Sequence, residues 1–428
     1  MANAFETATL ITNEVVRIAH NSSAFLGRMN TDYEKEWKGK YAPGATVYAR
    51  RPVQFTIRNG ATASLQDLTD SKVAITVNPE MGIDFAVTDF DLTMAIRNDG
   101  SIDKAFRERF LKPAGLRIAA EVDYQVATLV KNATANFVGT PGTGPSTYQH
   151  IADAQIPMDN EACPRDGMRY AALSPTANAA VIGGLSGLFN AGKAISDNYK
   201  TGVMQDALGL NFVMSQNVPS HTVGPLGGTP LVNGANQGTI NSGATDNPYA
   251  ATTSLVTDGW TAAAAARLKK GDVITLGLGG VRVESVNPET KASTGELRNF
   301  VLQADVSSDA SGNATLVIAP AIIAGGAFQN VTARPADNAA ITVVSGAAST
   351  TYRQNIIWHR DAITFVSPEM EVPGGMDMAS SSSLADEGGI SLRFVRGFDI
   401  LNNKRVSRFD VLWGAAVTKP EWVVRRTS

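Results

Sequence analysis

Residues 101–131 read SIDKAFRERFLKPAGLRIAAEVDYQVATLVK, which is the longest helical pattern in the chain. Its apolar stripe recurs at helical spacing through Ile102, Phe106, Phe110, Ala119, Val122, Val126 and Leu129. Ser101 can cap the start, and Pro113 inside the pattern should kink or interrupt the helix. A helix of roughly 30 residues would be about 45 Å long. We therefore expect a structural strut with a hinge at Pro113.

Two β patterns precede this helix. The segments 53–58 and 73–78 each alternate apolar and polar residues, which is typical of a half-buried antiparallel pair. The polar stretch 59–70 between them is longer than a tight hairpin requires. A lone two-stranded ribbon is marginally stable in water. We expect a long projecting loop that a neighbouring subunit covers.

Basic side chains gather on or beside this loop. They are Arg50, Arg51, Arg58 and Lys72. An ordinary solvated face would account for them, and the alternative is ion pairing with acidic groups on a neighbouring subunit. A single exposed pair contributes little stability, but an assembly repeats it many times. We keep these four residues as candidate intersubunit contacts.

The N-terminal segment has the character of an arm. Residues 7–20 predict a short amphipathic helix, and residues 32–40 are strongly charged. Too few apolar residues occur here for a core. The acidic residues Glu6 and Glu14 are a candidate contact for an assembly partner, with a solvated face as the alternative.

Past the long helix, the composition predicts one α+β body interrupted by an inserted β domain. Ser174-Pro175 is a helix start, followed by alanine-rich sequence to Gly192, and a second short helix is expected at 196–208. The composition shifts near residue 220. Short apolar strands punctuated by glycine then suggest a small β-barrel before residue 350. Strand patterns at 355–358, 363–366, 392–395 and 406–413 complete the body.

Overall composition excludes several classes of protein. A chain of 428 residues should form two or three domains, and its charged fraction of 18% is low. Net charge is −3 with no basic stripe, which disfavours electrostatic wrapping of DNA. The single cysteine, Cys163, allows no intrachain disulfide and fits a reducing cytoplasm. The N-terminus lacks a signal-peptide pattern, and no apolar run is long enough to span a bilayer.

The sequence offers no arrangement that would carry catalysis or hold a cofactor or metal. The four histidines are far apart and lack metal-ligand spacing. The glycine-rich stretch 139–145 lacks the lysine and Ser/Thr of a phosphate-binding loop. One cysteine without a histidine partner in the pattern is poor support for thiol catalysis. We expect neither an enzyme nor a cofactor.

Several short motifs, in this order and spacing, resemble one protein family. They are Asp67-Leu-Thr-Asp70, Leu268-Lys-Lys-Gly-Asp272, Asn355-Ile-Ile-Trp358, Asp361-Ala-Ile363, Val366-Ser367, Leu412-Trp413-Gly414 and Thr418-Lys-Pro420. No single motif is specific, but together they extend over nearly the whole chain. The chain resembles the major capsid proteins of tailed double-stranded DNA phages, which have the HK97-type fold. Within that group it is similar to the P22 coat protein branch, which carries an insertion domain.

This resemblance implies an α+β fold with a defined order of parts. In sequence they are an N-terminal arm (1–45), an extended loop (46–85), a peripheral domain with its spine helix (86–133), a first axial segment (134–220), an inserted β-barrel (221–349), a second axial segment (350–395) and peripheral strands (396–428).

The resemblance also implies a function. Subunits would form pentamers and hexamers in an icosahedral shell that encloses phage DNA without reading its sequence. A scaffolding protein would guide a procapsid that expands on packaging, with a portal at one vertex and with or without decoration proteins. Glu6 and Glu14 become candidate scaffold contacts. The protein would be assembled in the host bacterial cytoplasm and located in the virion, with no membrane partner. The alternatives are an encapsulin-like compartment and a secreted β-rich binding module.

Overall fold

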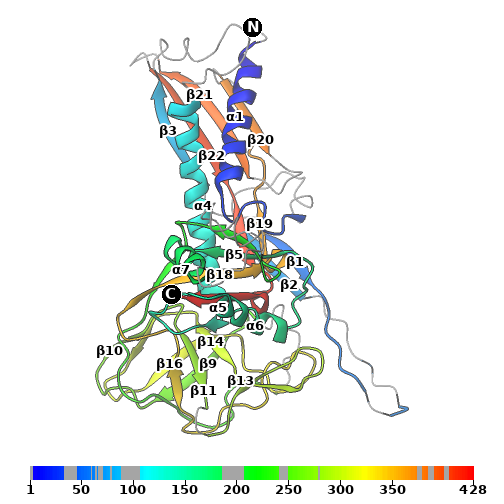
Figure 1. Cartoon of the computed structure of the whole chain (residues 1–428), viewed down its shortest axis with the longest axis vertical. Coiled ribbons are helices and arrows are strands. Elements are labelled where there is room, and N and C mark those ends of the chain that lie inside the picture. The colour runs from blue at the N-terminus through cyan, green and yellow to red at the C-terminus, as the bar shows by residue number, and fades with distance from the viewer. Residues whose placement is uncertain are drawn as a thin grey trace. The chain divides into compact units, whose positions relative to one another are not determined.

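A computed structural model gives a mixed α+β protein (Figure 1). It describes residues 3–32, 46–58, 60–62, 65, 71–77, 80–87, 107–185, 207–240, 249–277, 280–373, 378–383, 390–399 and 404–428. The chain divides into two compact units, and the division falls within one long helix after Val126. The first unit contains 1–49, 74–126 and 363–416, and the second contains 50–73, 127–362 and 417–428.

The first unit is built on an antiparallel sheet in the order β20-β21-β22-β3. The strands are β3 (Glu80–Val87), β20 (Met378–Ser383), β21 (Ser391–Asp399) and β22 (Lys404–Leu412). Helix α1 (Asn3–Ser22) contacts β20 and β21. Its buried side chains Ile11, Val15 and Ala19 recur every four residues, so one face of the helix is apolar. The expected helix at 7–20 is thus present and slightly longer.

The long helix α4 (Lys112–Ala133) follows a π-helical turn, η2 (Arg107–Leu111). Its inward face includes Val122 and Val126, which are fully buried. One polar residue on this helix, Asp123, is also buried and accepts a hydrogen bond from the N–H of Ala24 at 2.8 Å. Burial raises the pKa of the Asp123 carboxyl. The carboxyl therefore holds the turn that follows α1 against α4.

Two small pairs of strands complete this part of the chain. β19 (Ile363–Val366) pairs with β23 (Gly414–Val417), and β1 (Thr46–Arg51) pairs with β2 (Ser71–Thr76). The rings of Phe365 and Trp413 stack with centroids 5.8 Å apart. Phe365 lies on β19 and Trp413 directly precedes β23, so the stacked rings help to hold these two paired strands together.

The second unit contains a mixed sheet in the order β4-β24-β18-β5-β6, with β7 also paired to β18. Its elements are β4 (Phe137–Val138), α5 (Tyr148–Asp153), α6 (Ile156–Asn160), β5 (Arg169–Leu173), α7 (Pro175–Leu185), β6 (Asn211–Met214), β7 (Ser220–Thr222), β18 (Thr351–His359), η3 (Arg360–Ala362), η5 (Pro420–Trp422) and β24 (Val423–Thr427). Ser174 caps α7 because its Oγ accepts from the N–H of Ala177 at 3.2 Å. The predicted helix start is confirmed.

Between β7 and β18 lies an inserted segment, and within its described residues (223–240, 249–277 and 280–350) the strands pair with one another. They are β8 (Leu231–Val232), β9 (Thr253–Asp258), β10 (Ala265–Leu268), β11 (Val273–Leu276), β12 (Glu284–Val286), β13 (Ser293–Leu297), β14 (Asn299–Leu302), β15 (Val306–Ser308), β16 (Ala314–Ala319) and β17 (Ile341–Val343). Six form a sheet in the order β17-β11-β14-β16-β9-β8. A bridge between Leu231 and Ala340 joins its two edges, with Val232 N–H donating to Ala339 O at 3.0 Å.

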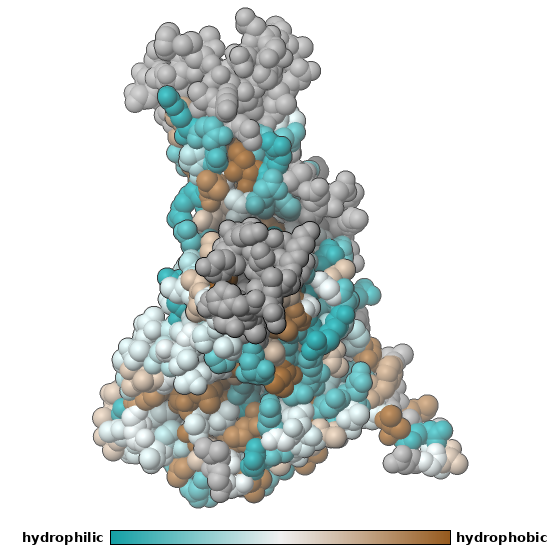
Figure 2. Space-filling view, in the orientation of Figure 1, coloured by the Kyte–Doolittle hydropathy of each residue, from teal (hydrophilic) through white to brown (hydrophobic). Residues whose placement is uncertain are grey.

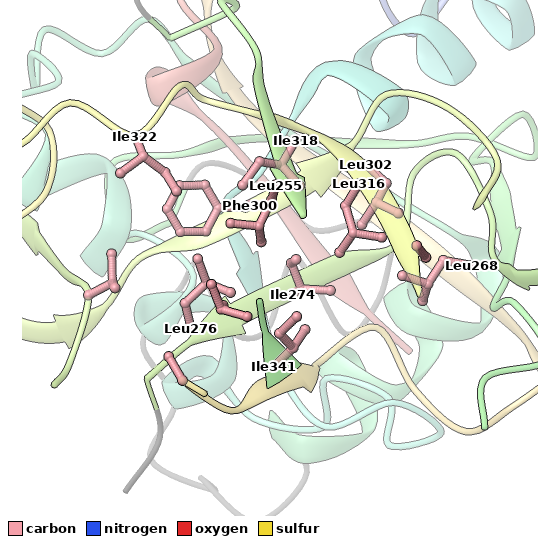
Figure 3. Close-up of a cluster of buried hydrophobic side chains, with 14 of the residues drawn as sticks. Leu255, Leu268, Ile274, Leu276, Phe300, Leu302, Leu316, Ile318, Ile322 and Ile341 are labelled. Carbon is pink, nitrogen blue, oxygen red and sulfur yellow. The ribbon is translucent and has the colours of Figure 1, made fainter. Parts of the chain in front are cut away.

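An apolar core fills this segment (Figure 3). Its members are apolar residues that alternate along the strands, among them Leu255, Leu268, Ile274, Leu276, Phe300, Leu302, Leu316, Ile318, Ile322 and Ile341. A second cluster joins the segment to the body, since Phe137 of β4 packs with Val273 and Val301. The inserted segment therefore has its own core and a separate apolar contact with the sheet that carries it.

Several expectations can be compared with these elements. The patterns at 355–358, 363–366 and 392–395 lie on strands, and the pattern at 406–413 lies on β22 except for Trp413, which follows it. The short helix expected at 196–208 falls mostly outside the described residues, and the part at 207–208 is a bridge and turn. Strand β24 hydrogen-bonds to β18, so the last residues share a sheet with 351–359 and do not join the strands at 396–412.

Candidate functional site: the extended loop and the junctions of the second unit

The segment between β1 and β2 exposes apolar side chains. Phe55 is 62% exposed, Ile57 91% and Leu65 96%. Figure 2 shows brown, hydrophobic atoms on this projecting segment at the lower right. The expected strand at 53–58 is not formed, because residues 52–58 have no ladder and β1 ends at Arg51. The expected return strand is present as β2. Exposed apolar side chains gathered on one segment form a candidate contact surface for another protein.

Three of the four basic candidates are exposed around this loop. Arg50 lies near the end of β1 and Lys72 lies on β2, and both are exposed. Arg58 donates from Nη1 to the backbone carbonyl of Thr62 at 3.2 Å and also to that of Gly60. The guanidinium of Arg58 thus holds the described part of the loop tip in a turn.

The fourth candidate, Arg51, points into its own chain. Its guanidinium forms an ion pair with Glu421 and donates to the backbone carbonyl of Thr418 at 2.5 Å. The side chains of Arg51 and Glu421 are only 8% and 7% exposed. A carboxylate of the same subunit therefore neutralises Arg51, whereas the sequence left open a solvated face or an ion pair with a neighbouring subunit.

Pro113 lies in the first turn of α4 and not in the middle of a longer helix. Proline has no N–H to donate to the preceding turn, so it is tolerated where the helical hydrogen-bond pattern changes. The π-helical turn at Arg107–Leu111 comes immediately before, so the helical geometry changes just before Pro113, and the hinge at Pro113 stays a prediction. Residues 101–106 lie outside the described part of the chain.

The two acidic candidates lie on α1. The carboxylate of Glu14 pairs with Arg17 at 2.9 Å, one turn along the helix. The side chain of Glu6 lies outside the described residues. An ion pair at this spacing contributes only about 0.3–0.5 kcal/mol, so Glu14 remains able to exchange Arg17 for another cation.

A fully buried carboxylate, which sequence reasoning did not single out, fastens the inserted segment at both ends. Asp272 accepts from His221 Nε2 at 2.7 Å, in β7, and from the N–H of Gly224 at 3.1 Å, on the incoming connector. It also accepts from Ser345 Oγ at 3.1 Å on the outgoing connector, and from the N–H of Lys269 at 2.8 Å. The only sequence signal was the motif Leu268–Asp272, which carried part of the family resemblance and gave no role to Asp272.

The electrostatics of this junction follow from burial and hydrogen bonding. Burial acts to raise the pKa of Asp272, but the bonds from His221 and Lys269 lower it overall. Burial lowers the pKa of His221 more than its bond to Asp272 raises it. At neutral pH we therefore infer a neutral His221 that donates to an ionised Asp272.

The described residues offer nothing that would hold a metal ion, since no group of three or more His, Cys, Asp or Glu side chains gathers among them. His359 pairs with Asp166 at 3.1 Å, away from the junction at His221. Burial raises the pKa of the Cys163 thiol to about 12, so this cysteine is a poor nucleophile. Within the same residues, no helix is long and apolar enough to cross a bilayer.

Comparison with known proteins identifies the family. The sequence model of the family described as P22 coat protein (gene protein 5) matches residues 10–425. The chain belongs to the P22 coat protein family. Its α+β fold is accordingly of the HK97 capsid type, and the chain is a phage major capsid protein, as the resemblance implied.

Solved structures give distant similarities. A structure from Mycobacterium phage Che8 is 12% identical with a TM-score of 0.44, covering 93% of this chain and 89% of that one. The capsid structure of the cyanophage P-SCSP1u is 11% identical with a TM-score of 0.40, covering 90% and 83%. A virus-like particle from Pyrococcus furiosus is 8% identical with a TM-score of 0.38, covering 97% of each chain. No curated protein sequence matches. The family assignment rests on the match to the coat protein model.

Proposed function

We propose that this coat protein assembles through pentamers and hexamers into an icosahedral shell that encloses phage double-stranded DNA. The observation that carries the proposal is the exposed apolar face of the extended loop, with Phe55, Ile57 and Leu65 all more than half exposed. A monomer gains nothing from such a surface, whereas a second copy that covers it removes apolar area from water. A closed ring of such head-to-tail contacts would generate the capsomers.

Charged groups around the loop would fix its register on the neighbour. Arg50, Arg58 and Lys72 are exposed and would face acidic groups of the adjacent subunit. Such rim charges mainly set specificity and association rate. Arg51 would contribute differently, because its partner Glu421 belongs to the same chain.

We assign the parts of the chain as the family resemblance implies. The first unit would supply the peripheral domain with its spine helix, and the sheet of the second unit would be the axial domain. The inserted segment would be a small β-barrel, which the bridge between the edge strands β8 and β17 supports. The last residues, in β24, would count with the axial sheet because they pair with β18.

Assembly would involve further partners. A scaffolding protein would contact the acidic side of α1 at Glu6 and Glu14, a portal would occupy one vertex, and the shell would expand on packaging. The π-helical turn and Pro113 at the start of α4 would be the hinge. Hydrogen exchange compared between procapsid and expanded shell tests this, because unchanged rates across 101–133 would remove the hinge.

Electron microscopy of the protein expressed with its genomic neighbours tests the proposed function. Uniform icosahedral shells are the expected result, and DNA inside them would separate a capsid from an encapsulin-like compartment. Particles that never enclose DNA would contradict the phage capsid function. A soluble monomer under all conditions, with affinity for glycan or protein, would favour a binding module instead.

A further inference from the structure

Four segments of the second unit meet around one buried tyrosine. Tyr249, in the inserted segment, is 6% exposed. Around it lie Arg51 at the base of the extended loop, Glu161 after α6, Arg298 before β14 and Glu421 in η5. These residues are far apart in sequence, so the cluster joins loop, body and insert at a single place.

The two carboxylates belong to the body and are held by it. The backbone carbonyl of Glu421 accepts from Asn136 Nδ2 at 2.9 Å. The backbone carbonyl of Glu161 accepts from the indole Nε1 of Trp422 at 3.1 Å. Since β24 follows at once and pairs along β18, both carboxylates are fixed relative to the central sheet.

Each carboxylate takes an arginine from a different part of the chain. Glu421 pairs with Arg51 from the loop base, and Glu161 pairs with Arg298 from the insert. Both side chains of the second pair are only 4% exposed. Burial acts to lower the pKa of Arg298, but the charge of Glu161 raises it overall. The guanidinium therefore stays ionised, and loss of its partner would leave an uncompensated buried charge.

Both arginines contact the ring of Tyr249. The guanidinium carbon of Arg51 is 5.4 Å from its ring centroid, and that of Arg298 is 5.7 Å away. Both distances are within the range of a cation–π contact. The phenol also interacts with the carboxylate of Glu161 and helps to lower the pKa of that group, while burial keeps the hydroxyl protonated by raising its own pKa. One ring thus contacts both ion pairs at once.

We propose that Tyr249 is a positioning residue that couples the inserted segment to the base of the extended loop. Movement of Arg298 shifts the ring, and the ring is the surface on which the Arg51 guanidinium rests. The orientation of the extended loop where it leaves β1 then depends on the position of the inserted segment relative to the sheet that carries it. The coupling lies within one chain, and only its consequence for a neighbouring subunit rests on the proposed function.

A double-mutant comparison tests whether Tyr249 couples the inserted segment to the loop base. It can do so because Arg51 and Arg298 form separate ion pairs. The variants are Arg51→Met, Arg298→Met and both together, in the unassembled full-length chain. The readout is hydrogen exchange of residues 46–58. We expect each single variant to accelerate exchange by about tenfold, through local opening of the loop base. The double variant should fall short of the product of the two by at least about threefold.

The matched control is Arg282→Met. Arg282 is also in the insert and pairs with Glu284 at 2.9 Å, but its side chain is 52% exposed. It should leave exchange at 46–58 unchanged and combine with Arg51→Met as a simple product. The proposal is overturned if Arg298→Met accelerates exchange only inside the insert, or if the Arg51 and Arg298 effects multiply independently.

Tyr249→Phe keeps the inference testable if the arginine variants do not fold. This change removes only the hydroxyl, which interacts with Glu161, and retains the ring. We expect a smaller acceleration at 46–58, about threefold, and unchanged exchange there would count against the coupling. Because these measurements use unassembled chains, they stand whether or not electron microscopy shows shells.

Discussion

The strand β16 and the extended loop carry the same alternation of apolar and polar residues but have opposite environments. Leu316 and Ile318 on β16 are fully buried, because their side chains pack into the core of the inserted segment. Phe55 and Ile57 on the loop are exposed, and residues 52–58 have no ladder. Alternation of apolar and polar residues therefore predicts that one face of a strand will be buried. It does not predict whether the same chain or a neighbouring subunit buries that face.

The energetic consequence separates folding from assembly. Burial of a leucine or isoleucine side chain contributes roughly 1.5–3 kcal/mol, and β16 contributes this to the stability of its own subunit. The loop contributes almost nothing until another surface covers it. Substitutions in the two regions should therefore change different measurements, which gives four tests in order of decreasing effect on subunit stability.

The largest loss of stability should follow Leu316→Ala. The substitution leaves a cavity in the core shown in Figure 3, so we expect the free energy of unfolding to fall by about 2–5 kcal/mol. Chemical denaturation of the unassembled chain measures it. Thr315→Ala, at an exposed position on the same strand, should change stability by less than about 0.5 kcal/mol. Equal effects at the two positions would mean that the insert does not contribute cooperatively to unfolding.

Asp272→Asn should come next. The carboxylate accepts four hydrogen bonds while fully buried. An amide cannot accept at both atoms, so at least one donor is left without a partner, at a cost of about 1–3 kcal/mol. Denaturation measures the loss, and exchange at 220–224 and 345–353 should rise together because both connectors are released. A rise at one connector alone would contradict the fastening role of Asp272.

Acidification should weaken the same junction. Burial lowers the pKa of His221, so the unfolded chain binds a proton more readily than the folded one. Stability from this group is thus present above about pH 6.5 and declines as the pH falls below that value. Lys131 and Arg425, which also face His221, keep their charge in this range. His221→Gln should flatten the slope between pH 7 and 5.5, and an unchanged slope would assign it to other groups.

The sequence predicted the periodic elements well because their cause is local. The α1 helix, the cap at Ser174 and the strands of the insert follow from spacing and turn residues that neighbours in the sequence determine. The resemblance supplied the family and therefore the fold, which spacing alone could not.

The candidate site was less predictable because it depends on long-range pairing. Arg51 resembled the other basic residues of the loop, and nothing local indicated that Glu421, almost at the other end of the chain, would neutralise it. Asp272 and Tyr249 were likewise unremarkable in the sequence. Their partners come from segments tens to hundreds of residues away.

The smallest effect on subunit stability, and the sharpest test of the comparison, should come from Ile57→Ser. The side chain is 91% exposed, so its loss should change the free energy of unfolding by less than about 0.5 kcal/mol. Shell formation should nevertheless fall, because the apolar area that Ile57 offers to a neighbour is lost at every repeat of the contact. Light scattering of assembly reactions measures this against Thr56→Ser, a nearby exposed control. Normal assembly of Ile57→Ser would show that the apolar face of the loop is not the contact surface. Loss of assembly with unchanged stability would show that the same alternating pattern stabilises the subunit in β16 and serves assembly in the extended loop.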